Sequence, residues 1–219
     1  MQQWTGYINI GVFISGRGSN LKELIKYSKR NNTNWKIKLV ISNKKKAKGL
    51  IYAKKNKIQN YTIEKKKHHF EKKALRHLKK NKINLLCLAG FMRILSKEFI
   101  QKCKSKIINI HPSLLPKYKG LNTHKRAMQA GDKYTGSTVH YVSAKLDSGK
   151  RILQTKVKIF KTDNPNTVAK RVLKAEHLIY PKAVNIVCNK IIWKLFFKKK
   201  INFNFSVFFT IRTVNRIFI

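Results

Sequence analysis

Short apolar runs alternate with amphipathic segments along the first half of the chain. The run INIGVFIS (8–15) is followed by LKELIKYSKR (21–30), in which Leu21, Leu24 and Ile25 recur at helical spacing. Apolar runs of this length between turn residues predict buried strands, and the segments between them predict helices. Strands are expected at residues 8–15, 36–43, 60–64, 83–90 and 106–110, and helices at 21–30, 46–57, 69–81, 96–104 and 123–132.

This alternation predicts an α/β fold, with an open, mostly parallel, Rossmann-like sheet and helices on both faces. Residues 136–160 predict two further strands around a glycine-containing loop, which would form an antiparallel edge. A long helical segment follows over 165–191, entered at Asn164–Pro165 and open to interruption at Pro181. We expect one domain over 1–198 and an atypical basic, aromatic tail over 199–219. In that tail, the alternation of residues 201–211 is compatible with a final strand.

The charge of the chain is unusual, with 50 Lys and Arg against 8 Asp and Glu and a net charge of +42. Such an excess is typical of proteins that bind a polyanion, such as nucleic acid or an anionic membrane. It also arises by compositional drift, in which lysines accumulate without a binding role. Because the lysines are spread along the chain and not clustered in one motif, we favour drift. We therefore expect no specific nucleic-acid partner.

The cysteines and the termini point to the cytoplasm. Cys87, Cys103 and Cys188 are far apart in sequence, which indicates neither a zinc site nor a disulfide framework, and we expect no metal. The N-terminus lacks the pattern of a signal peptide, and no uninterrupted apolar stretch is long enough to span a membrane. A cytoplasmic protein without a membrane partner is expected.

The segment SGRGSN (15–20) lies between a predicted strand and a predicted helix. The amides of Gly18, Ser19 and Asn20 would then lie at a helix N-terminus, where a phosphate is favoured. Leu21 replaces the third glycine of a dinucleotide fingerprint, and no acid follows the second strand, so an NAD site is not expected. The alternative is a tight glycine turn without a ligand.

Asn109 and His111 are two residues apart at the end of a predicted strand, so their side chains share one face. Both groups could simply be satisfied polar residues at the end of a sheet. Asp147 favours a site, since one of only eight acids falls in a glycine loop between strands, although an Asx turn would also place it there. Near His111, its carboxylate would raise the pKa of the imidazole and allow an imidazolium at neutral pH. Amide, imidazole and carboxylate together suit acyl transfer without a covalent intermediate.

These segments resemble the glycinamide ribonucleotide formyltransferases, the folate-dependent enzymes of purine synthesis. The resemblance covers about residues 8–192 and is densest in SGRGSNL, LAGFMRILS, NIHPSLLPKYKGLNTHKRAMQAGD, TGSTVHYV, LDSGKRILQ and AEHLIYP. It implies a formyltransferase-type sheet, with a phosphate-binding half over 1–105 and a catalytic, folate-binding half over 106–198. The implied reaction is direct transfer of a formyl group from the co-substrate 10-formyltetrahydrofolate to the amine of glycinamide ribonucleotide.

The resemblance also implies roles for individual positions. The implied catalytic residues are Asn109, His111 and Asp147. The implied ribonucleotide-binding residues are Gly18, Ser19, Asn20, Leu173, Lys174, Ala175 and Glu176. The implied folate-binding residues are Lys67, Met92, Arg93, Ile94, Leu95, Asn109, Ser143, Ala144, Lys145, Leu146 and Asp147. An exposed Glu176 would instead be an ordinary surface residue.

Arg151 stands where the resembling enzymes usually carry an aliphatic residue, and it could pair with Asp147 and weaken its action on His111. The methionyl-tRNA formyltransferases share the fold and the three catalytic residues, but the tail over 199–219 is too short for their extra domain. A formyltetrahydrofolate hydrolase would need an N-terminal regulatory domain, which we do not expect here. A non-catalytic relative that binds nucleic acid stays open as a different class, and both a monomer and a homodimer are open.

Overall fold

The computed structural model describes residues 7–64 and 66–214, with side chains up to residue 197. The strands are β1 (Ile8–Ile14), β2 (Trp35–Ser42), β3 (Gln59–Thr62), β4 (Leu85–Leu88), β5 (Lys106–His111), β6 (Tyr134–Tyr141) and β7 (Arg151–Lys158). The helices are α1 (Ser19–Ser28), α2 (Leu50–Lys55), α3 (Lys67–Lys80), α4 (Lys97–Lys102), α5 (Thr123–Gln129) and α6 (Pro165–Val214). All the strands and helices predicted up to residue 191 are present. The predicted cap is also present, since the Ser96 hydroxyl accepts a hydrogen bond from the Phe99 N–H at the start of α4.

The strands form one sheet in the order β3-β2-β1-β4-β5-β6-β7. β1 to β5 are parallel, while β6 and β7 are antiparallel, which confirms the predicted mixed sheet. The chain runs outward from β1 through β2 to β3 and then returns to place β4 on the other side of β1. Because loops diverge at such a switch point, the carboxyl ends of β1 and β4 border a crevice that commonly holds ligands.

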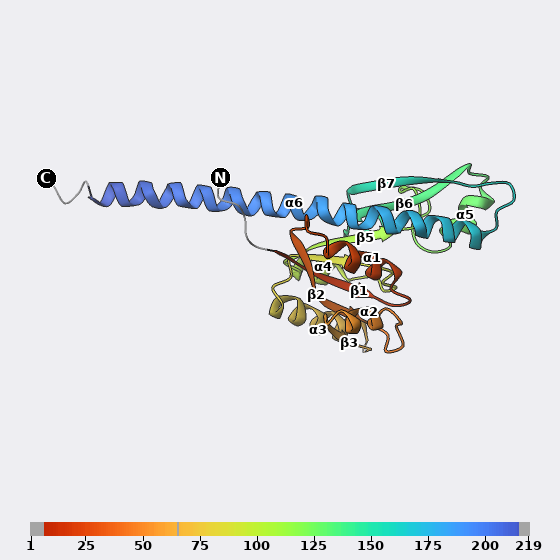
Figure 1. Ribbon diagram of the computed structural model, residues 1–219, viewed down its shortest axis with the longest axis horizontal. Coiled ribbons are helices and arrows are strands. Elements are labelled where there is room, and N and C mark those ends of the chain that lie inside the picture. The colour runs from red at the N-terminus through yellow and green to blue at the C-terminus, as the bar shows by residue number, and fades with distance from the viewer. Residues whose placement is uncertain (1–6, 65, 215–219) are drawn as a thin grey trace.

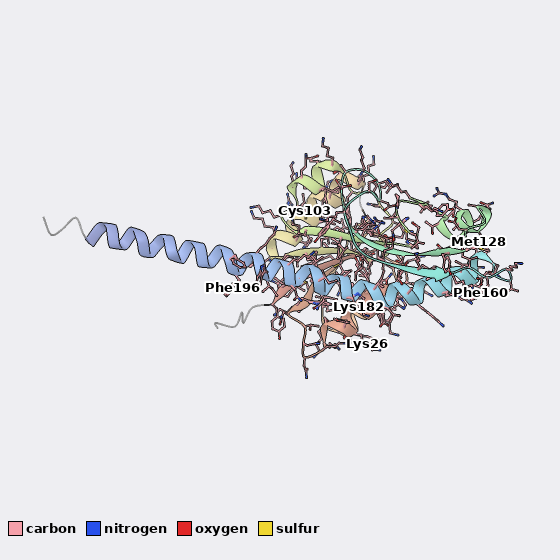
Figure 2. The ribbon with its side chains drawn as sticks, turned by 90° about the horizontal axis from the view of Figure 1, so that it is seen from above. Lys26, Cys103, Met128, Phe160, Lys182 and Phe196 are labelled. Carbon is pink, nitrogen blue, oxygen red and sulfur yellow. The ribbon has the colours of Figure 1, made fainter. Side chains whose placement is uncertain are left out.

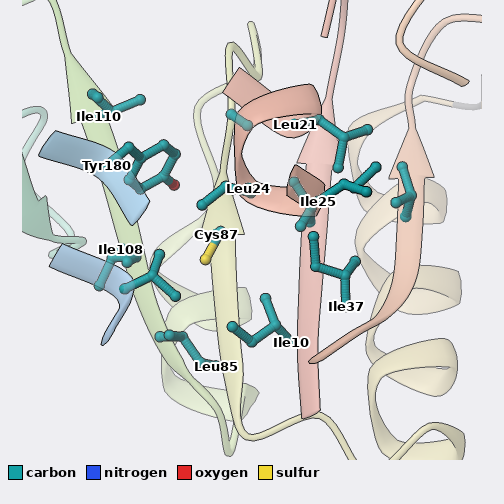
Figure 3. Packing of buried hydrophobic residues seen from close by; sticks show 14 of the residues in the cluster. Ile10, Leu21, Leu24, Ile25, Ile37, Leu85, Cys87, Ile108, Ile110 and Tyr180 are labelled. Atoms are coloured by element: carbon teal, nitrogen blue, oxygen red, sulfur yellow. The ribbon is translucent and has the colours of Figure 1, made fainter. Parts of the chain in front are cut away.

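Two apolar cores lie on opposite faces of the sheet. The first includes Ile10 of β1, Leu24 of α1 and Tyr180 of α6 (Figure 3). The second core lies under α3 and α4 and includes Phe13 and Phe70. Alternate residues of β1 supply the two cores, as expected of a central strand with both faces covered.

Helix α6 crosses one face of the sheet and then continues beyond it (Figure 1). Pro181 is inside the helix and does not interrupt it. The strand considered for residues 201–211 is wrong, because α6 runs through them to Val214. No glycine or proline follows Pro181 in the sequence, so the chain offers nothing that would end the helix early. No helix within the described residues is long and apolar enough to cross a membrane.

Candidate active site

A cavity of about 670 Å³ opens at the carboxyl ends of β4 and β5. Its walls come from the segment after β4, the loop after β5, the β6–β7 loop and the start of α6. The cavity therefore lies beside the switch point of the sheet, where the parallel strands end.

The three predicted catalytic residues converge in this cavity. Asn109 and His111 are at the end of β5, and Asp147 is in the β6–β7 loop. The Nδ1 atom of His111 lies 3.3 Å from Oδ2 of Asp147. The side chains of His111 and Asp147 are 7% and 8% exposed, so their interaction takes place largely out of water.

The loop conformation fixes the Asp147 carboxylate. Asp147 has a left-handed backbone with φ of 45°, which is uncommon for a residue with a side chain. Its Oδ2 atom accepts a hydrogen bond of 3.0 Å from the Gly120 N–H. Burial alone would raise the pKa of Asp147, but its neighbours, among them the Gly120 N–H that donates to Oδ2, hold it below its ordinary value. The carboxylate is therefore ionised at neutral pH.

The expected rise in the pKa of His111 is wrong. Burial lowers this pKa below its ordinary value and outweighs the opposing effects of the Tyr118 carbonyl and Asp147. The ring is held from both sides, because Nδ1 faces Asp147 and Nε2 lies 2.9 Å from the Tyr118 carbonyl oxygen, which is an acceptor. The assignment that fits this acceptor places a proton on Nε2.

The sequence reasoning missed His140, a buried residue of β6 that faces the same carboxylate. Its Nε2 atom is 3.6 Å from Oδ1 of Asp147 and 3.3 Å from the side-chain nitrogen of Asn109. Its Nδ1 atom lies 2.9 Å from the Tyr141 carbonyl oxygen, so the proton belongs on Nδ1 and Nε2 accepts from Asn109. This pairing orients the amide of Asn109 and leaves its second N–H available to the cavity. The sequence did show a histidine within a predicted strand of the antiparallel edge, but only the structure gives the register that places His140 opposite Asn109.

Arg151 does not pair with Asp147, contrary to the possibility considered above. Its Nη1 atom donates a 3.1 Å hydrogen bond to the carbonyl oxygen of Leu115, which also accepts one of 3.0 Å from Gln154. Leu115 belongs to the loop in which Tyr118 contacts His111 and Gly120 contacts Asp147. Arg151 therefore holds the base of this loop.

The glycine loop after β1 makes a tight turn that leads directly into α1. Gly18 has a φ of +75°, and a Cβ atom there would lie 2.4 Å from the Cα of Gly49. The loop is tied to the chain before α2 by a 3.0 Å hydrogen bond from the Gly49 N–H to the Gly16 carbonyl. Only glycine fits at position 18, and Ser19 and Asn20 open α1 directly after it.

Glu176 is only 7% exposed, so it is not an ordinary surface residue. Its Oε2 atom accepts a 2.7 Å hydrogen bond from the side-chain nitrogen of Asn20, which joins α6 to the first turn of α1. Burial raises the pKa of Glu176 to about 7, and the Asn20 hydrogen bond opposes this only in part. Residues 173–175 occupy the preceding turn of α6.

Most of the residues predicted to bind folate line the cavity. They are Met92, Arg93, Ile94, Leu95, Asn109, Ser143, Ala144, Lys145, Leu146 and Asp147. Lys67 is the exception, since it begins α3 as an exposed residue and is not among those that line the cavity. Ser15 was missed, although its hydroxyl accepts from the Met92 N–H and donates to Asn43, which links the glycine loop to the cavity wall.

Within the described part of the chain, no cluster of three or more His, Cys, Asp or Glu side chains could hold a metal ion.

Comparison with known proteins gives a consistent result. The model of the formyl transferase family matches residues 8–184. The phosphoribosylglycinamide formyltransferase of Escherichia coli is 39% identical over 182 residues, with 81% of this chain and 86% of that protein covered. The human trifunctional purine biosynthetic protein adenosine-3 is 41% identical over 184 residues, which are 82% of this chain. The chain spans only 18% of the human protein's length, and 14–20% of its chicken, midge, fly and bovine counterparts.

Solved structures agree with the sequence comparison. The crystal structure of phosphoribosylglycinamide formyltransferase from Anaplasma phagocytophilum superposes with a TM-score of 0.80 at 42% identity, and covers 84% of this chain and 87% of that one. Glycinamide ribonucleotide transformylase 1 from Symbiobacterium toebii gives a TM-score of 0.81 at 31% identity, with 87% and 92% covered. From the sheet order, the cavity and these matches together, the chain belongs to the formyl transferase family.

Proposed function

We propose that this chain transfers a formyl group from 10-formyltetrahydrofolate to the amine of glycinamide ribonucleotide, a step of purine synthesis. The observation that carries the proposal is the convergence of Asn109, His111 and Asp147 in one cavity, whose wall is tied at Met92 to Ser15 at the start of the glycine loop. The relatives named phosphoribosylglycinamide formyltransferase support this substrate pair.

The two substrates would approach from opposite sides of the catalytic residues. The phosphate of the ribonucleotide binds the N–H groups of Gly18, Ser19 and Asn20, and the Glu176 carboxyl accepts hydrogen bonds from its ribose hydroxyls. The folate lies along the cavity wall formed by residues 92–95 and 143–147. This arrangement brings the ribonucleotide amine to the formyl carbon at the end of β5.

The reaction begins when the amine attacks the formyl carbon, so that a C–N bond forms and the carbonyl electrons move to oxygen. The free amide N–H of Asn109 and the Nε2–H of His111 donate hydrogen bonds to this oxyanion, with His111 turning from the Tyr118 carbonyl. A proton leaves the attacking nitrogen and reaches the departing folate nitrogen through the Asp147 carboxylate. The bond from carbon to that nitrogen then breaks, the carbonyl re-forms, and no net proton is gained or lost.

A comparison of formyl acceptors tests the proposal. The protein is incubated with 10-formyltetrahydrofolate and, separately, glycinamide ribonucleotide, methionyl-tRNA or water alone. We expect formyl transfer to the ribonucleotide to exceed transfer to the other two acceptors by at least 100-fold. Transfer to methionyl-tRNA, or hydrolysis at a comparable rate without an acceptor, would contradict the assignment.

A further inference from the structure

A second cleft lies near the amino ends of β4 and β5, opposite the carboxyl ends at which the active site opens. It has a volume of about 340 Å³ and lies between the end of α3 and the segment that joins α4 to β5. Because β4 and β5 are parallel, the segments that precede them meet at their amino ends. A 2.7 Å hydrogen bond from the Ser105 hydroxyl to the Ile83 carbonyl joins these two segments.

The cleft combines an apolar floor with a cationic rim. Leu75, Leu78 and Ile83 are among its apolar lining residues. The charged lining residues are Arg76, Lys79, Lys82, Lys102 and Lys104, and the lining includes no acid among the described residues. Lys102 pairs with Glu98 at 2.6 Å, whereas the other four cations take part in none of the ion pairs of the described chain.

Helix ends explain part of this charge but not the cleft itself. The carboxyl ends of α3 and α4 lie here, and cations are favoured near helix carboxyl ends. Lys82 and Lys104 lie outside both helices, however, and still border the apolar floor. A hollow with an apolar floor and unpaired cations on its rim matches a ligand with an apolar body and a negative end.

We propose that this cleft binds a small amphipathic anion, namely a carboxylate that carries an apolar chain. The chain packs against Leu75, Leu78 and Ile83, and the carboxylate lies among the ammonium groups of the rim. Such a ligand replaces water over the apolar floor and supplies the negative charge that the lining of the cleft lacks. The site lies away from the catalytic residues, so it does not depend on the proposed reaction.

Cys103 offers a reporter inside the cleft, next to α4 (Figure 2). Cys87 and Cys188 are fully buried, while Cys103 is partly exposed. Burial also raises the pKa of the Cys103 thiol, so its alkylation is slow enough to follow. A bound ligand would cover this sulfur and slow the alkylation further.

The test measures the rate at which N-ethylmaleimide alkylates Cys103, by mass spectrometry of the peptide that contains it. Decanoate, below its micelle-forming concentration, is the probe. Acetate provides the charge without the chain, and decyltrimethylammonium provides the chain with the opposite charge. We expect decanoate to slow alkylation at least fivefold and the other two to change it less than twofold.

Paired variants locate the charge that is responsible. Lys79→Gln with Lys82→Gln removes two rim cations, and we expect the decanoate concentration for half-protection to rise at least tenfold. Lys72→Gln with Lys73→Gln is the matched control, because these exposed α3 residues do not line the cleft. Thermal melting by circular dichroism checks that both pairs are folded.

Three results would overturn the proposal. The first is equal protection by decanoate and decyltrimethylammonium, which would show an apolar site without charge selection. The second is no protection by decanoate in a folded protein. The third is equal weakening in both variant pairs, which would show a general effect of net charge.

Discussion

Burial of Glu176 predicts a specific dependence of stability on pH. The substitution Glu176→Gln keeps the shape of the side chain and an oxygen that accepts from Asn20, while it removes the ionisable group. The folded protein raises the pKa of Glu176 from an ordinary value of 4.5 to about 7. The unfolded chain therefore ionises first as the pH rises, which makes folding less favourable between these two values.

The magnitude follows from the difference between the two pKa values. Each pH unit between them is worth about 1.36 kcal/mol, so ionising Glu176 costs the folded state roughly 3 kcal/mol above pH 7. Below pH 4.5 the carboxyl is protonated in both states and the cost is absent. The Glu176→Gln protein should thus match the parent near pH 4.5 and exceed its free energy of unfolding by roughly 3 kcal/mol at pH 8.

Urea unfolding at pH values from 4.5 to 8 measures this difference. Glu23→Gln is the control, because it removes a partly exposed carboxylate from α1, the helix that also carries Asn20. Its difference from the parent should change by less than about 1 kcal/mol over the same range. A Glu176→Gln difference that stays constant with pH would refute the burial argument, as would a gain in the control of the same size.

Three further substitutions probe the loop, the missed histidine and the unusual arginine. Gly18→Ala should lower the free energy of unfolding by at least about 3 kcal/mol in urea, more than Gly90→Ala, which shares a positive φ but has open space at its Cβ position; equal losses would mean that backbone contact is unimportant. His140→Ala should lower kcat for formyl transfer at least tenfold with KM changed less than threefold, because Asn109 loses the acceptor that orients it; an unchanged kcat would argue against that role. Arg151→Leu should cost about 1 kcal/mol of stability and leave kcat within threefold of the parent, and a large rise in kcat would mean that Arg151 suppresses the site.

Much of the fold was predictable, because each strand and helix has its own apolar spacing. The central strands β1 and β4 are largely apolar runs, and Ser96 and Pro165 mark helix starts that the structure confirms. The tail was predicted less well. Its alternation over 201–211 favours a strand, but without a neighbouring strand to pair with, the segment continues the preceding helix.

The candidate site was predictable where a residue type is scarce or its motif is specific. Asp147 stood out among eight acids, and its loop does bring it to His111. The histidine pKa was predicted with the wrong direction, because sequence shows a neighbouring charge but not the depth of burial that opposes it. The position of Arg151 was also missed, since its partner is a backbone carbonyl, which no side-chain pattern reveals.

The central claim is that Asn109, His111 and Asp147 carry out formyl transfer, and the most direct test is turnover by Asp147→Asn. The rate of transfer from 10-formyltetrahydrofolate to glycinamide ribonucleotide is measured together with the binding of each substrate. Asp163→Asn is the control, because that carboxylate pairs with Arg171 and is not among the residues lining the cavity. We predict that Asp147→Asn lowers kcat by about 100-fold or more while both substrates still bind, and that Asp163→Asn does not. Turnover within threefold of the parent for Asp147→Asn would contradict the account.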